Sequence, residues 1–147
     1  MATSVESSPV DAGGPRLSGQ TIVFPLGLIG CETWRSFVLE SDPSGDPVLT
    51  LRCLDQPGIA FWVADPFTIV SDYEVPINDA EGMSIRLKDL SDALVLCILT
   101  VRPPPVGVTA NLLGPLVINV RERLGRQIVL SESKYSVRQQ VLAEGAW

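Results

Sequence analysis

The feature that most constrains this chain is a series of short apolar runs, each closed by glycine, proline, asparagine or aspartate. About eight such runs occur, separated by roughly 6–15 positions: 20–24, 36–40, 48–53, 59–64, 72–77, 93–101, 116–120 and 127–130. Runs of this length are typical of β-strands, because helices need longer periodic segments. The pattern predicts an all-β fold, a small antiparallel barrel-like domain or a sandwich.

Alternation within the runs predicts which side chains face the core. The positions predicted to face inward in two of them are Leu49, Leu51, Cys53, Tyr73, Val75 and Ile77. The run 59–64 is almost wholly apolar, which predicts burial on both faces. The run 93–101 is the strongest strand, and Pro103 and the two prolines after it end it, because proline cannot donate to a ladder.

Two segments between the strands also carry predictions. Residues 78–85 mix helical and strand spacing, and we expect one short helix there, or two in the domain as a whole. Residues 121–126 read R-E-R-L-G-R, which predicts a hairpin turn around Gly125 that joins the last two strands.

The chain length of 147 residues predicts a single domain. Residues 1–18 are rich in serine, proline and glycine and are expected to form a flexible tail, so the β domain is expected to span 19–143. The start of the chain lacks an apolar signal-like segment, and the apolar stretch 93–100 is too short to cross a membrane. We therefore expect a cytoplasmic protein that does not bind membranes and is a monomer on its own.

The complete absence of histidine excludes several classes of site. Histidine-activated nucleophiles, histidine-ligated zinc and histidine pH switches cannot be built. Cys31, Cys53 and Cys97 are too widely spaced for a C-x-x-C metal motif, and they are expected to be reduced core thiols. No nucleotide-binding glycine motif is present, so we expect no enzyme, metal or cofactor.

Four acidic residues are candidates for carboxylate chemistry. Asp55 and Asp65 both precede a proline within two positions, which is typical of turns. Asp72 and Glu74 are two positions apart, which places them on one exposed strand face. A pair of carboxylates could serve as general acid and base, but the turn and solvated-face interpretations are favoured for all four.

Polar residues in the apolar C-terminal third have two interpretations. Asn111 and Asn119 either brace a turn and a strand end, or present amides to a partner, because a buried amide must satisfy up to four hydrogen bonds. Tyr135 and Arg138 are expected to pack their apolar parts on the domain and keep the hydroxyl and guanidinium near the surface.

The net charge of −6 is unevenly distributed. Residues 40–92 carry eleven acids and three bases, a balance of −8, whereas 102–138 carry six bases and two acids, a balance of +4. The acidic part is suited to a basic protein partner. A nucleic-acid-binding barrel that uses Arg121, Arg123 and Arg126 is the alternative, and it is disfavoured because phosphate binding needs a concentrated basic face.

Several segments, in order, resemble the FliW family of bacterial flagellar assembly factors. The matching segments are G-L-I-G at 27–30, F-V-L at 37–39, P-V-L-T-L-R-C-L-D-Q-P-G-I-A-F-W-V-A-D-P-F at 47–67, D-Y-E-V at 72–75, D-A-L-V-L-C-I-L-T-V at 92–101, T-A-N-L-L-G-P-L-V-I-N at 109–119 and Y-S-V-R at 135–138. The likeness covers roughly 20–142. It departs from the family at Cys31, where an aromatic is usual, and at 51–53, where Leu-Gln-Ser is usual.

The resemblance implies a barrel-like β fold and a role that consists of binding two proteins in turn. One is flagellin, held in the cytoplasm before export. The other is CsrA, an RNA-binding translational regulator that represses flagellin synthesis and that the free FliW-like protein antagonises. No direct nucleic-acid contact is expected. We take Asp55, Asp65, Asp72 and Glu74 as a candidate acidic face for the regulator, and Asn111, Asn119, Tyr135 and Arg138 as further candidate partner contacts.

Overall fold

The computed structural model describes residues 3–5, 17, 19–41, 47–103 and 107–141, and the structural statements below concern these residues. Its strands form one large sheet and a separate pair, β1 (Thr3–Val5) with β6 (Val75–Ile77). The large sheet contains β2 (Thr21–Val23), β3 (Ser36–Glu40), β4 (Leu49–Cys53), β5 (Ala60–Ala64), β7 (Ala93–Val101), β8 (Val108–Ala110), β9 (Leu116–Asn119), β10 (Leu124–Gln127) and β11 (Gln139–Gln140).

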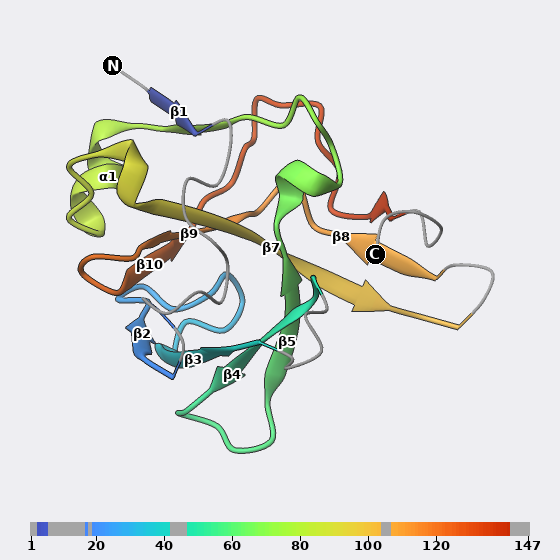
Figure 1. Cartoon of the computed structure of the whole chain (residues 1–147), viewed down its shortest axis with the longest axis horizontal. Helices are drawn as coiled ribbons and strands as arrows, with labels where there is room; N and C mark the ends of the chain where they lie inside the picture. Colours follow the sequence, from blue (N-terminus) through green and yellow to red (C-terminus); the bar gives the residue numbers. More distant parts are fainter. Residues whose placement is uncertain (1–2, 6–16, 18, 42–46, 104–106, 142–147) are drawn as a thin grey trace.

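The large sheet closes on itself. The strands follow the order β7-β5-β4-β3-β2-β10-β9, and β9 also pairs with β7, which completes the barrel. All described pairs are antiparallel except β2 with β10, where Leu124 lies opposite Val23 in a parallel pair. The long strand β7 runs past the barrel, and its far end carries β8 and β11 (Figure 1). The predicted all-β, barrel-like fold is confirmed, with one parallel closure.

The barrel interior is filled by alternate residues of its strands. On β4, Leu49, Leu51 and Cys53 are all buried while Arg52 between them is exposed, which confirms the predicted inward face. This inner core consists of Leu17, Ile22, Phe24, Leu28, Phe37, Leu39, Leu49, Leu51, Cys53, Val63, Leu94, Leu96, Leu116, Ile118 and Val120. Because β-strand side chains alternate, these residues leave the other face of each strand outside the barrel.

A second, outer core covers one side of the barrel wall. Ala93, Val95, Cys97 and Leu99 alternate with the inward residues of β7 and pack against segments outside the barrel. The segments that cover them contribute Val5, Tyr73, Val75, Ile77, Ile85, Leu112, Ile128, Leu130 and Val141. Burial of Tyr73, Val75 and Ile77 confirms the inward face predicted for 72–77, although the strand itself begins at Val75. Both faces of β7 are therefore buried from Ala93 to Cys97.

Three short helical segments lie in this covering layer. They are η1 (Pro66–Thr68), α1 (Asp79–Ser84) and η2 (Leu90–Asp92). The helix expected within 78–85 is confirmed as α1. It starts with a capping box, in which the Asn78 side chain accepts from Glu81 N at 2.8 Å and Glu81 Oε1 accepts from Asn78 N at 2.9 Å.

The prediction that 59–64 is buried on both faces is wrong. On β5, Val63 and Ala64 are buried, but Ala60 is exposed and Trp62 keeps 51% of its surface accessible. The covering layer reaches only the end of β5 that holds Ala64, so the outer face at Trp62 meets solvent. A continuous apolar run predicts two buried faces only where the fold supplies a second layer.

The predicted hairpin is present, but its turn is displaced. The turn occupies residues 120–123, and Gly125 lies inside β10 opposite Ile118. A side chain at Gly125 would place its Cβ 2.6 Å from Cζ of Phe24, so the glycine is needed for close packing and not for turning. The strand predicted at 127–130 is accordingly found at Leu124–Gln127.

The segment predicted as a flexible tail, 1–18, is described only at 3–5 and 17. There Thr3–Val5 forms β1, and Val5 and Leu17 are 3% and 2% exposed, so these residues belong to the folded domain. The rest of that segment, the end of the predicted domain at 143 and two of the prolines after β7 lie outside the described residues. No described helix is long and apolar enough to cross a membrane.

Candidate partner-binding surface

Two of the predicted acidic residues and one predicted aromatic residue come together beside β6. Asp72 and Glu74 are both exposed, and Tyr135 bridges their backbone from a segment more than sixty positions away. Its hydroxyl accepts a hydrogen bond from Glu74 N at 3.0 Å and lies 3.4 Å from the carbonyl oxygen of Asp72. The Tyr135 ring packs on Tyr73, with centroids 4.6 Å apart. These contacts hold the two carboxylates on a fixed loop.

Tyr73 anchors this loop in the outer core. It is 1% exposed, and its hydroxyl donates to the carbonyl oxygen of Leu112 at 2.7 Å. The ring also meets Phe67 edge-on at 5.6 Å between centroids. Burial raises the pKa of Tyr73 above its ordinary value, so the phenol stays protonated and remains a donor.

Asp65 is half-buried and acts as a helix cap. Its side chain accepts from Phe67 N at 2.9 Å at the start of η1. Burial raises the pKa of Asp65 above its ordinary value, against the opposing effect of that hydrogen bond. Cys97 lies nearby in the outer core, where burial and the Asp65 charge raise the pKa of its thiol to about 12. The thiol is therefore a protonated core group and not a nucleophile.

Asp55 lies at the opposite end of β5 from Asp65. Its carboxylate accepts from Arg35 N and Ser36 N, both at 2.7 Å. These two backbone hydrogen bonds lower the pKa of Asp55 below its ordinary value, and the bond from Ser36 has the larger effect. Asp55 thus ties the loop after β4 to the start of β3. The structure separates it from Asp72 and Glu74, so the four predicted acids do not form one face.

Asn111 and Asn119 use their amides inside the protein. Asn111 Oδ1 accepts from the backbone N–H groups of Leu113 and Gly114 at 3.2 and 3.0 Å. Asn119 is 2% exposed, and it donates to the carbonyl oxygens of Ile85 and Arg86 and accepts from Arg121 N and Glu122 N. The turn-bracing interpretation describes both. We therefore withdraw Asn119 as a partner contact, because a buried side chain with these bonds has nothing left to offer a partner.

Arg138 remains on the surface as expected. It is exposed, and its backbone N–H donates to Ser136 Oγ at 2.9 Å just before β11. The three arginines of the nucleic-acid alternative differ in their surroundings. Arg121 pairs with Asp92 at 3.2 Å, Arg123 donates to Gln20 at 3.2 Å and Arg126 is half-buried on β10.

Sequence reasoning missed an exposed apolar surface around α1. Leu26 and Ile29 are each 57% exposed, Val129 is 49% and Met83 is 77%. Three neighbouring hollows connect these side chains. The first is lined by Leu26, Ile29, Glu81 and Val129. The second has Glu81 and Val129 in common with the first and is also lined by Asn78, and the third has Asn78 in common with the second and is lined by Met83. We call this continuous region, defined by Leu26, Ile29, Asn78, Glu81, Met83 and Val129, the α1 surface. Its members come from three separate stretches of chain, 26–29, 78–83 and 129, so no local sequence pattern predicts it.

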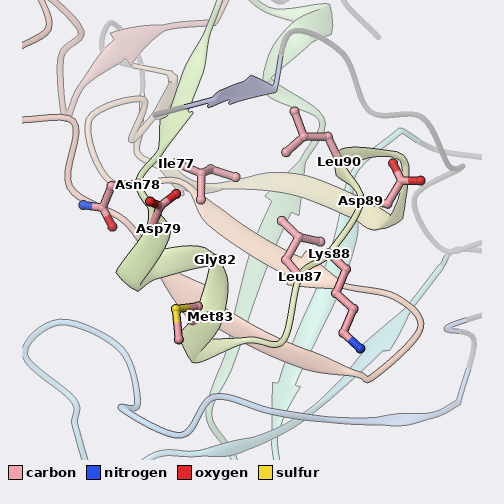
Figure 2. A pocket seen from close by; sticks show the side chains of 9 residues that line it. All are labelled: Ile77, Asn78, Asp79, Gly82, Met83, Leu87, Lys88, Asp89 and Leu90. Atoms are coloured by element: carbon pink, nitrogen blue, oxygen red, sulfur yellow. The ribbon is translucent and has the colours of Figure 1, made fainter. Parts of the chain in front are cut away.

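The hollow beside α1 is the largest of the three, at about 460 Å³. Figure 2 shows that Ile77, Leu87 and Leu90 supply its apolar wall, while Asp79, Lys88 and Asp89 stand around it. The second hollow, about 440 Å³, lies on the other side of Asn78 and is lined by Pro76, Ile128 and Leu130 among others. Open, shallow and partly apolar spaces of this kind suit side chains of a polypeptide partner.

Among the described residues, no group of three or more cysteine, aspartate or glutamate side chains is placed to hold a metal ion. Of the candidate acids, two hold backbone turns, and the exposed pair faces solvent on a loop. The fold and its surface thus define a small closed β-barrel protein with an exposed apolar surface beside exposed acids.

Comparison with known proteins agrees with this class. The family described as FliW protein matches residues 16–141. The chain is 32% identical over 123 residues to the flagellar assembly factor FliW of Clostridium tetani (strain Massachusetts / E88), covering 84% of this chain and 85% of the relative. Against the flagellar assembly factor FliW of Treponema pallidum (strain Nichols) it is 32% identical over 127 residues, covering 86% and 84%.

A solved structure gives the same answer. The crystal structure of a flagellar assembly factor FliW superimposes with a TM-score of 0.77 at 25% identity, over 97% of this chain and 99% of that one. This chain belongs to the FliW family of flagellar assembly factors. The resemblance to the FliW family that we inferred from the segments between 27 and 138 is confirmed.

Proposed function

We propose that this protein binds flagellin in the cytoplasm and, when it is free, binds and antagonises the translational regulator CsrA. The observation that carries the proposal is membership of the flagellar assembly factor family over nearly the whole folded domain. The surface supports it, because the described residues form no metal cluster and offer instead an exposed apolar region with acidic neighbours.

Competition between two partners is sufficient for such a switch. A protein that holds one polypeptide at a time is withdrawn from the second in proportion to the free concentration of the first. As flagellin leaves the cell, the free fraction of this protein rises and captures more regulator. No bond is made or broken, which is why we expect the protein not to be an enzyme.

We assign the regulator to the exposed loop that carries Asp72 and Glu74. An RNA-binding regulator is basic, and these two carboxylates are exposed and fixed by Tyr135. Complementary charge accelerates encounter and selects the partner. We exclude Asp55 and Asp65 from this face, because the side chain of each accepts hydrogen bonds from backbone N–H groups in a turn. The flagellin subunit is assigned to the α1 surface, whose apolar side chains gain most from burial. The two surfaces adjoin, because β6 connects Glu74 to Asn78 and Pro76 lines a hollow of the α1 surface, so we expect a partner on one surface to obstruct a partner on the other.

Charge reversal tests the assignment to the regulator. Asp72→Lys with Glu74→Lys is expected to weaken binding roughly tenfold at low salt and to reduce its salt dependence. Glu40→Lys with Glu122→Lys is the matched control, because it makes the same charge change at two exposed ion pairs elsewhere on the surface. Equal losses of regulator affinity in both double variants would indicate a general charge effect. If neither variant lost affinity, the assignment of the regulator to this acidic face would be wrong.

A titration with purified partners tests the function as a whole. Flagellin is expected to form a one-to-one complex with this protein, and added regulator is expected to compete for it. The nucleic-acid alternative is tested in parallel by a gel shift with RNA and this protein alone, where we expect no shift. Failure to bind flagellin together with an RNA shift would favour the alternative.

A further inference from the structure

The edge of β6 is filled by the N-terminal strand of the chain itself. β1 pairs with β6 antiparallel, with Thr3 opposite Ile77 and Val5 opposite Val75. This small sheet is separate from the barrel and lies beside the segment that leads into α1 (Figure 1). β6 therefore accepts a strand that is not part of the barrel.

Pro76 decides which of the two edges of β6 can pair with another strand. Ser4 lies opposite Pro76, and proline has no N–H to donate, so the ladder must run through the flanking Val75 and Ile77. The opposite edge of β6, toward which the ring nitrogen of Pro76 points, cannot form a continuous ladder. β6 thus offers one edge for strand addition, and β1 occupies it.

The two side chains of β1 that the structure describes differ in burial. Val5 is 3% exposed and belongs to the outer core together with Val75, Ile77 and Tyr73. Ser4, the next residue along the strand, is only half-buried, as alternation requires. The edge therefore combines backbone pairing with a socket at the place of Val5 for a small, branched apolar side chain.

The family match includes β6 but not β1. The family match begins at residue 16, so β6 lies within it and β1 lies outside it. The paired segment is three residues long, and an isolated two-stranded ladder of that length has little stability of its own. The part of the chain that matches the family thus carries the acceptor strand, and a segment outside the match supplies its occupant.

We propose that the β6 edge is a binding site for an extended strand of another polypeptide, and that β1 is a built-in competitor for it. The incoming strand carries a small apolar, preferably β-branched, side chain at the place of Val5. The site adjoins the α1 surface, because Ile77 lines the hollow beside α1 and Pro76 lines the hollow on the other side of Asn78. A strand seated there continues into both hollows. Addition of a strand to an exposed edge is a common mode of peptide recognition.

The test uses the full chain and a synthetic peptide of residues 1–8. Val5→Asp in the protein places a charge in the apolar socket and releases β1, and the wild-type peptide is then expected to bind in trans. The unaltered protein is expected to bind the peptide at least about tenfold more weakly, because its tethered β1 competes at millimolar effective concentration. Ser4→Asp in the protein is the matched control, since the same charge is added at the half-buried position, and it should behave like the unaltered chain.

Amide hydrogen exchange locates the effect. Val75 and Ile77 are expected to exchange faster in Val5→Asp by at least about tenfold, and added wild-type peptide is expected to restore their protection. A peptide that itself carries Val5→Asp should neither bind nor protect. If Val5→Asp lowers the overall stability too far, Val5→Ala weakens the socket without a charge and takes its place. Absence of peptide binding to the variant protein at about 1 mM, or equal binding of both peptides, would overturn the proposal.

Discussion

The two cores of this protein are built from the same strand but in different ways. β7 sends Leu94 and Leu96 into the barrel and Val95 and Cys97 into the outer core. The inner core is enclosed by paired strands on all sides. The outer core is closed by β1, β6, the loop that carries Tyr73, and the segments that carry Leu112 and Leu130. The covering layer depends on single contacts, such as the Tyr73 hydroxyl on the Leu112 carbonyl.

This difference separates stability from recognition. Backbone ladders around the inner core fix the barrel, in which each strand pairs with a neighbouring strand on both sides. The covering layer joins its segments partly through single side-chain hydrogen bonds, and α1 and the Asp72–Glu74 loop both lie on it. Segments of low local stability are the usual carriers of binding sites. We therefore expect changes in the inner core to act on folding, and changes in the covering layer to act chiefly on partners.

The largest expected effect comes from the same truncation in each core. Leu94→Ala empties space between paired strands that cannot collapse, and it should reduce the free energy of unfolding by an amount in the upper half of about 2–5 kcal/mol. Leu130→Ala removes the same atoms from the outer core, where the covering segment can move inward, and should fall in the lower half of about 2–5 kcal/mol. Urea unfolding measures both, and equal losses would remove the distinction between the cores.

Two glycines sharpen the comparison. Gly125→Ala places a methyl group 2.6 Å from the Phe24 ring and is expected to cost about 1–3 kcal/mol of unfolding free energy. Gly82→Ala is the control in the covering layer, where the nearest atom, Cγ2 of Ile77, lies 3.8 Å away. Because alanine favours helix, Gly82→Ala should be neutral or stabilising by up to about 1 kcal/mol. Thermal unfolding of both variants gives the signs, and a neutral Gly125→Ala would contradict the packing argument.

Removal of the hydroxyl group should cost more stability at one tyrosine of the covering layer than at another. Tyr73→Phe leaves the buried Leu112 carbonyl without its donor and is expected to cost about 1–3 kcal/mol of stability. Tyr135→Phe frees groups that water can reach, so its cost should stay below about 1 kcal/mol. If Tyr135→Phe also weakens regulator binding without unfolding the protein, its role in fixing Asp72 and Glu74 is supported. Chemical denaturation and a binding titration on the same samples separate the two effects.

The smallest expected effect is a pair of opposite pH dependences at the two ends of β5. The lowered pKa of Asp55 stabilises the fold above the ordinary value of 3.8, and this stability is lost as pH falls below it. The raised pKa of Asp65 acts in reverse, with stability present below 3.8 and lost as pH rises through its folded value. Asp55→Asn should flatten the acid side of the stability curve and Asp65→Asn the side above pH 3.8. Unfolding measured from pH 3 to 7 checks both signs, and slopes that change alike would contradict this assignment.

The inner core was largely predictable from the sequence, and the covering layer was not. Alternation located β4 and its inward face, and apolar length located β7, because both signals lie within one strand. Whether Trp62 is covered depends on a layer assembled from other parts of the chain, and the need for Gly125 depends on the Phe24 ring from a distant strand. The same limit applies to the site. The sequence identified Asp72, Glu74 and Tyr135 singly, whereas their contact, like the α1 surface, exists only after folding.

The central claim is that one folded protein is shared between two polypeptide partners. Its most direct test is a calorimetric titration of this protein with flagellin, repeated in the presence of saturating regulator. We expect one flagellin subunit to bind per protein, with an apparent affinity that falls as regulator is added. Absence of a flagellin complex, or an affinity that regulator leaves unchanged, would contradict it.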